Sequence, residues 1–129
     1  MLHPRLLLID DEPQLGEYVA HVAKECGFVS DVTSDDGDFR RSFMKARPDM
    51  VSIDLGMPGM DGVELLRFLS DQRYTAPVLI VSGFDRRVLE SAFRLGEALG
   101  LTMAGPIEKP MRADLLADVF NRLRTRLAA

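Results

Sequence analysis

The chain has 129 residues, of which 47% are hydrophobic and 28% charged, a balance typical of one folded domain and not of a disordered segment. The formal net charge is -4, and no Lys/Arg cluster lies among aromatic residues, which argues against direct binding of nucleic acid. Cys26 is the single cysteine, so an internal disulfide is excluded, and because no apolar run is long enough to span a membrane, a cytoplasmic location is expected.

Five short apolar runs alternate with five segments in which apolar residues recur every three or four positions. The runs have the length of buried strands, and the recurring pattern is that of amphipathic helices. The predicted strands are residues 5–9, 28–32, 50–54, 78–81 and 101–107. The predicted helices are residues 13–26, 62–70, 85–98 and 111–127 and a segment between residues 34 and 48. This alternation predicts an α/β fold, with a doubly wound parallel sheet covered by helices on both faces.

The apolar stripes of the helices predict which residues face the core. Cys26 continues the stripe of the first helix and is expected to be a buried hydrophobic residue. The stripes of the second, fourth and last helices are Phe39, Phe43 and Ala46; Val88, Ala92, Leu95 and Leu99; and Leu115, Leu116, Val119, Phe120 and Leu123.

Polar residues that could bind a ligand or take part in a reaction lie at the carboxyl ends of the predicted strands. Asp10 and Asp11 follow the first strand and Asp54 ends the third. Ser82 follows the fourth strand and Lys109 the fifth. In a doubly wound sheet these ends share one rim, so the five residues are expected to converge on one shallow pocket.

Asp54 opens a stretch that turns sharply between a strand and a helix. Pro58 fixes φ and lacks an N–H donor, and Asp61 is a suitable N-cap for the helix that begins near Gly62. Asp54 could simply cap this turn. Its position at the ligand-binding edge of an open α/β sheet makes it a candidate site residue as well.

The set of residues at the rim suits phosphoryl transfer. Three crowded carboxylates repel one another, and a hard divalent cation with oxygen ligands relieves that repulsion, Mg²⁺ being the natural choice. Lys109 adds a positive charge and Ser82 a hydroxyl donor. Together these are the parts needed to transfer a phosphoryl group to a carboxylate nucleophile. Each residue alone also has a structural explanation, as a cap, a turn residue or a surface charge, but the joint pattern favours a shared site.

With these motifs in place, the sequence resembles a receiver domain of a two-component response regulator over essentially its whole length. The motifs are Asp10-Asp11, Asp54 with Met57-Pro58 and Asp61-Gly62, Ser82, and Lys109-Pro110. The resemblance implies a CheY-like (βα)5 sandwich of the flavodoxin type, with a five-stranded parallel sheet in the order 2-1-3-4-5.

The resemblance also implies a role for each motif residue. Asp54 would accept a phosphoryl group from a phosphohistidine on a sensor kinase or phosphotransfer protein. Asp11, Asp54 and the backbone carbonyl of Gly56 would bind Mg²⁺ directly, and Asp10 largely through water. Lys109 and Ser82 would hold phosphoryl oxygens. An output domain or partner protein would read the change, and a homodimer through the fourth and fifth helices is left open.

Two further features come with the resemblance. The peptide bond before Pro110 is expected to be cis. The chain also departs from the family pattern, because Pro106 occupies a position that usually holds an aromatic residue or histidine. The segment between Ser82 and Lys109 is longer than usual, and residues 97–101 are expected to extend the fourth helix by about a turn.

Three other functions could be served by polar residues at the strand ends of such a fold. A haloacid-dehalogenase-type phosphatase needs an acid two residues after its nucleophile, but Gly56 stands there, so turnover is not expected and an acyl phosphate should hydrolyse slowly. A receiver-like interaction module that works without phosphorylation is the second alternative. A nucleotide-binding relative is disfavoured, because no Gly-x-Gly-x-x-Gly follows the first strand.

Residues 1–129 are expected to form a single domain, either stand-alone or part of a longer protein.

Overall fold

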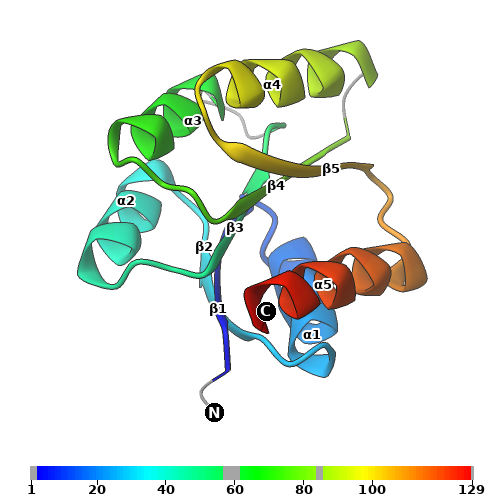
Figure 1. Cartoon of the computed structure of the whole chain (residues 1–129). Coiled ribbons are helices and arrows are strands. Elements are labelled where there is room, and N and C mark those ends of the chain that lie inside the picture. Colours follow the sequence, from blue (N-terminus) through cyan, green and yellow to red (C-terminus); the bar gives the residue numbers. More distant parts are fainter. Residues whose placement is uncertain (1–2, 57–61, 84–85, 129) are drawn as a thin grey trace.

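The computed structural model describes residues 3–56, 62–83 and 86–128, in which five strands alternate with five helices (Figure 1). The strands are β1 (Arg5–Ile9), β2 (Val29–Thr33), β3 (Met50–Asp54), β4 (Pro77–Ser82) and β5 (Thr102–Glu108). The helices are α1 (Pro13–Glu25), α2 (Asp36–Lys45), α3 (Gly62–Asp71), α4 (Arg86–Ala98) and α5 (Ala113–Ala128).

The strands form one parallel sheet in the order β2-β1-β3-β4-β5, which confirms the predicted doubly wound, flavodoxin-like fold. Every residue of β3 and β4 is buried. Strands covered on both faces carry continuous apolar runs instead of an alternating pattern, which is why the sequence identified them. The predicted bounds of β1 and β3 agree with the structure at both ends.

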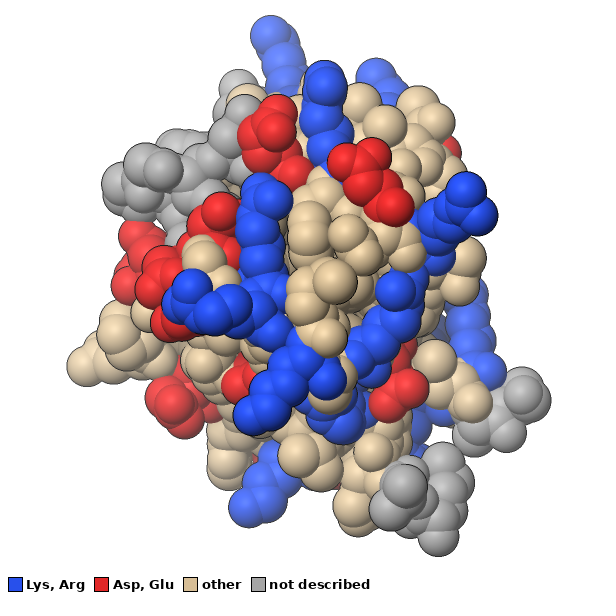
Figure 2. Space-filling model, turned by 90° about the vertical axis from the view of Figure 1, so that its left-hand side faces the viewer, with Lys and Arg blue, Asp and Glu red and all other residues tan. Residues whose placement is uncertain are grey.

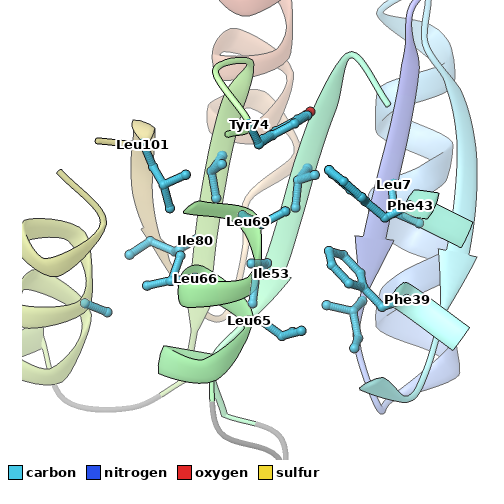
Figure 3. Packing of buried hydrophobic residues seen from close by; sticks show 14 of the residues in the cluster. Leu7, Phe39, Phe43, Ile53, Leu65, Leu66, Leu69, Tyr74, Ile80 and Leu101 are labelled. Atoms are coloured by element: carbon cyan, nitrogen blue, oxygen red, sulfur yellow. The ribbon is translucent and has the colours of Figure 1, made fainter. Parts of the chain in front are cut away.

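The helices divide between the two faces of the sheet (Figure 1). On one face α1 and α5 pack together, and their core includes Val22 and Phe120. On the other face lie α2, α3 and α4. Figure 3 shows Leu65, Leu66 and Leu69 of α3 around Ile53 of β3, with Phe39 and Phe43 of α2 to one side of them in the same core. The two cores fix the sheet between the helical layers and so hold the strand ends in place.

The apolar stripes of α4 and α5 correct part of the sequence prediction. Val88 was expected to face the core but is 49% exposed, and Leu89 beside it is buried. The inward face of α4 includes Gly96, where a Cβ atom would lie 2.2 Å from the Sδ atom of Met103. A contact made through a glycine leaves no apolar side chain to mark it in the sequence. Leu115 was likewise expected in the core but is 54% exposed.

The structure also shows the degree of burial of Cys26 and Ala46, the N-cap of α2 and the end of α4. Cys26 is 8% exposed, as predicted for a buried hydrophobic residue. Asp35 is the N-cap of α2, and its side chain accepts a hydrogen bond from the Asp38 backbone N–H at 2.8 Å. Ala46, expected on the buried face, is the exposed C-cap of α2. The predicted extension of α4 through residues 97–101 is wrong beyond Ala98, where the helix ends.

The pairing of β4 with β5 contains an irregularity that the sequence analysis did not predict. Leu79 lies opposite Ala104, whereas Val81 lies opposite Ile107, so β5 carries one extra residue. Gly105 within this segment has φ of +84°. Pro106, the residue at the usual aromatic position, therefore lies in a local bulge of β5.

The side of the molecule on which α2 lies carries charges of both signs, with Lys and Arg side chains between Asp and Glu side chains (Figure 2). Arg40 pairs with Asp36 and packs over the Phe68 ring at 4.8 Å. Arg47 packs over the Phe43 ring at 5.2 Å. These arginines are thus largely engaged with the protein's own surface.

In the part of the chain that is described, none of the helices combines the length and apolar character needed to cross a membrane.

Candidate functional site

The strand register brings the predicted polar residues to one edge of the sheet. Ile9 of β1 lies opposite Ile53 of β3, so the residues that follow β1 lie beside Asp54. Asp54 in turn lies opposite Val81, and Ser82 lies opposite Glu108, the residue before Lys109. Residues far apart in sequence therefore meet at the carboxyl ends of β1, β3, β4 and β5.

Asp54 is the most deeply placed of the candidate acids. It is 3% exposed, and its Oδ1 atom accepts a hydrogen bond from the Gly56 backbone N–H at 2.9 Å. The backbone of Leu55 continues the sheet by donating to the Val81 carbonyl at 2.9 Å. The Oδ2 atom of Asp54 faces Lys109. The carboxylate is thus fixed through one oxygen, while the other faces a cation.

Lys109 is the cation at the centre of the site. Its Nζ atom lies 3.1 Å from Asp54 Oδ2, 3.4 Å from Asp10 Oδ2 and 3.6 Å from Glu12 Oε1. Burial alone would lower the pKa of Lys109, but its hydrogen bonds to Asp54 and Asp10 and their charges outweigh burial and raise it. The ammonium form is therefore stabilised in the folded protein.

The backbone also positions Lys109. Its N–H donates to the Ser82 carbonyl at 2.8 Å, and the peptide bond to Pro110 is cis, as expected. Ser82 itself is fully buried at the end of β4. The predictions for Pro58 and Asp61 fall outside the described residues.

Asp10 is the second buried acid, at 5% exposure. Its Oδ1 atom accepts a hydrogen bond from the Glu12 backbone N–H at 2.9 Å. Burial raises the pKa of Asp10, and the Asp54 charge adds to this, although Glu12 N–H and Lys109 act in the opposite direction. The carboxylate therefore lies where further positive charge would favour its ionised form.

The acids next to Asp10 complete a group of oxygen donors. Carboxylate oxygens of Asp10, Asp11 and Glu12 lie within 4.8 Å of one another. Asp54 is close to the same group, because its Oδ2 atom and Asp10 Oδ2 both contact Lys109 Nζ. Among the described residues, these hard oxygen donors with the Lys109 ammonium beside them fit a divalent cation such as Mg²⁺.

Comparison with known proteins identifies the family. Residues 6–121 match the model of the response regulator receiver domain. This chain is a receiver domain. Domains of this family are the signalling modules of two-component systems.

Individual relatives agree with the assignment. The receiver domain is 35% identical over 126 residues to the DNA-binding response regulator MtrA of Mycolicibacterium smegmatis, covering 95% of this chain and 52% of that protein. It is 28% identical over 121 residues to protein-glutamate methylesterase/protein-glutamine glutaminase 3 of Hahella chejuensis, covering 93% of this chain and 35% of the other. This chain thus spans between a third and about half of the length of these two relatives.

Among solved structures, the receiver domain of Francisella response regulator 1452 superposes with a TM-score of 0.77 at 26% identity. The match covers 96% of this chain and 98% of that chain. A likeness that spans both chains almost completely supports the receiver fold as a whole.

Glu12 is the residue of this receiver domain that sequence reasoning missed. The sequence analysis does not single it out, yet its Oε1 atom lies 3.6 Å from Lys109 Nζ. The signal that could have identified it is its place two residues after Asp10, at the start of α1. An acid at this position is also common where a helix begins in solvent, so the sequence alone does not distinguish Glu12 from an ordinary exposed residue.

Proposed function

We propose that Asp54 of this receiver domain accepts a phosphoryl group from a phosphohistidine on a sensor kinase or phosphotransfer protein. The observation that carries the proposal is the buried Asp54 carboxylate, with one oxygen held by a backbone N–H at 2.9 Å and the other 3.1 Å from Lys109 Nζ. A fixed carboxylate beside a cation is suited to attack phosphorus while negative charge is stabilised nearby.

In the transfer, an Asp54 carboxylate oxygen forms a bond to phosphorus as the bond between phosphorus and the histidine nitrogen breaks. The electron pair of that bond stays on the ring nitrogen that held phosphorus. The imidazole leaves as a neutral ring, because its other nitrogen carries one proton. Lys109 and Ser82 would hold phosphoryl oxygens, since Lys109 Nζ lies 3.1 Å from Asp54 Oδ2 and Ser82 ends β4, the strand beside Asp54.

The carboxylates of Asp11 and Asp54 and the carbonyl of Gly56 would hold Mg²⁺, with Asp10 acting largely through water. When bound, the ion would neutralise charge on the phosphoryl oxygens. Gly56 brings no side chain that could activate water against the product. We therefore expect slow hydrolysis of the acyl phosphate and no turnover of other phosphate esters.

Phosphorylation would add about -1.5 to -2 charges at Asp54 and draw Lys109 and Ser82 toward the new group. Two contacts favour transmission of this movement to α4 and β5. Lys109 is tied to Ser82 through its backbone, and Arg86 at the start of α4 pairs with Glu108 at the end of β5 at 3.0 Å. An output domain or partner would read the shifted arrangement of α4 and β5.

A phosphohistidine-bearing partner must reach the rim close to Lys109. A pocket of about 480 Å³ opens there, lined by Leu15 and Tyr18 of α1 and by Lys109, Pro110 and Met111. Its mainly apolar lining suits contact with a protein surface.

We further propose that residues 1–129 act as one domain, stand-alone or within a longer cytoplasmic protein. A homodimer through α4 and α5 stays a prediction.

The test is the intact mass of the protein after incubation with acetyl phosphate, with Mg²⁺ or with a chelator. We expect one phosphoryl adduct in the wild type with Mg²⁺ and none in Asp54→Asn. The control is Asp118→Asn, which removes an exposed carboxylate on α5 and should keep the adduct. No adduct on the wild type under any condition would favour a module that works without phosphorylation, and repeated turnover of a phosphomonoester would favour a phosphatase.

A further inference from the structure

Lys109 is held by three carboxylates that differ in their surroundings. Asp54 and Asp10, at 3.1 and 3.4 Å from Nζ, have side chains that are 3% and 5% exposed. Glu12, at 3.6 Å, has a side chain that is 62% exposed. The ammonium group therefore lies between two buried acids below and one acid at the solvent-facing mouth of the site.

The two buried acids are anchored by the main chain, whereas the Glu12 carboxylate is free to move into solvent. Oδ1 of Asp54 accepts from Gly56 N–H, and Oδ1 of Asp10 accepts from Glu12 N–H, each at 2.9 Å. The backbone of Glu12 is fixed by that hydrogen bond. Its side chain can still exchange Lys109 for water at little cost, because an exposed ion pair contributes little free energy.

An ammonium group has three N–H donors, and in this arrangement three carboxylates compete for them. To contact a phosphoryl group arriving at Asp54, Lys109 must release one of these partners. Glu12 is the partner with a solvated alternative, and it also places a negative charge at the entrance that an anionic phosphodonor must pass.

We propose that Glu12 is a positioning residue that holds Lys109 toward the mouth of the unphosphorylated site and slows capture of a phosphoryl group from anionic donors. This inference rests on the proposed function of Asp54. With acetyl phosphate, an Asp54 oxygen bonds to phosphorus as the bond from phosphorus to the bridging oxygen breaks. Acetate leaves with that electron pair, and no redox partner takes part.

The test compares the rate of adduct formation from acetyl phosphate in the wild type, Glu12→Gln and Glu25→Gln at saturating Mg²⁺ and low ionic strength. Glu25 is the matched control, because it carries the same charge at the other end of α1, about 20 Å away. We expect Glu12→Gln to react about three to ten times faster than the wild type, and Glu25→Gln to react at the wild-type rate.

Two readouts separate a charge effect from a change in structure. The gain in Glu12→Gln should shrink when salt is raised, because the effect of an exposed charge is screened. It should also be smaller with phosphoramidate, which carries less negative charge than acetyl phosphate at neutral pH. In addition, beryllofluoride, an anionic mimic of the phosphoryl group, should bind more tightly to Glu12→Gln when binding is followed by NMR.

The outcomes distinguish the inference from the function on which it rests. A wild type that forms an adduct together with a Glu12→Gln variant that reacts at the same rate or more slowly would overturn the role of Glu12 alone. A gain that does not change with salt or donor charge would also overturn it. A wild type that forms no adduct would overturn both the inference and the proposed function.

Discussion

Lys109 links the chemistry of the site to its stability. Its ammonium group compensates two buried carboxylates, so we expect Lys109→Met to lower the free energy of unfolding by about 1–3 kcal/mol when Mg²⁺ is absent. Urea unfolding measures the change. Lys24→Met, which removes an exposed lysine on α1, is the matched control and should change stability by less than about 0.5 kcal/mol.

A second variant tests whether charge is the cause. Asp10→Asn in the Lys109→Met background removes one of the two uncompensated carboxylates, so it should recover part of the lost stability. If Lys109→Met were as stable as the wild type, or if adding Asp10→Asn lowered stability further, the ammonium would not be compensating these acids.

At this scale the sequence predicts residues that follow a recognisable strand. Asp10, Asp54 and Lys109 could be placed at one rim because the apolar run before each of them marks where its strand ends. The same logic cannot identify Glu12. Its role depends on the direction of a long, exposed side chain, which strand periodicity does not determine.

Among the elements, β5 is the one in which a backbone requirement can be tested. Gly105 has φ of +84°, and an added Cβ atom would lie 2.8 Å from Leu79 Cδ1 and 3.2 Å from the Ile107 backbone N. Gly105→Ala should therefore lower the free energy of unfolding by about 2–4 kcal/mol, combining backbone strain with steric overlap.

Gly100 provides the control for that measurement. It has a similar φ of +86°, but an added Cβ atom would meet nothing within 4 Å. Gly100→Ala should cost only the strain of the left-handed backbone, about 1–2 kcal/mol. Equal losses in the two variants would show that the neighbours of Gly105 do not constrain the bulge.

The elements also show where sequence patterns fail for a physical reason. Strands β3 and β4 are covered on both faces, so their apolar runs are unbroken and predict them well. In α4, Val88 and Leu89 both fit a helical stripe of apolar residues. The buried stripe is the one that contains Leu89 and Gly96, and Gly96 packs closely against Met103 because it has no side chain. A glycine does not count as apolar in the pattern, so the pattern alone favours Val88. The extra residue in β5 places Ala104 and Ile107, three positions apart, against the same core, which a strict alternation of faces does not predict.

At the scale of the whole molecule, Tyr74 ties two parts of one core together. Its phenol donates a hydrogen bond to the Pro48 carbonyl at 3.0 Å, and its ring packs against Phe43. Burial raises the pKa of Tyr74 above its ordinary value of 10.0. The stability from keeping this phenol neutral is therefore complete below pH 10 and is lost as the pH rises above it.

The expected result is a fall in the urea midpoint above about pH 10, measured from pH 8 to pH 11. Tyr74→Phe should be less stable at pH 8, because it leaves the Pro48 carbonyl without its donor, and its midpoint should fall less steeply above pH 10. Lys109 adds a loss of the same sign at higher pH, since its pKa is also raised. Identical alkaline slopes for the two proteins would contradict the role of Tyr74.

The most direct measurement is the location of the phosphoryl group after reaction with acetyl phosphate and Mg²⁺. Borohydride reduces an acyl phosphate to an alcohol, so a phosphorylated aspartate becomes homoserine, which tandem mass spectrometry of peptides can locate. The geometry of Asp54 and Lys109 predicts homoserine at position 54 alone. Homoserine at position 10 or 11, or at no position, would contradict the assignment of Asp54 as the phosphoryl acceptor.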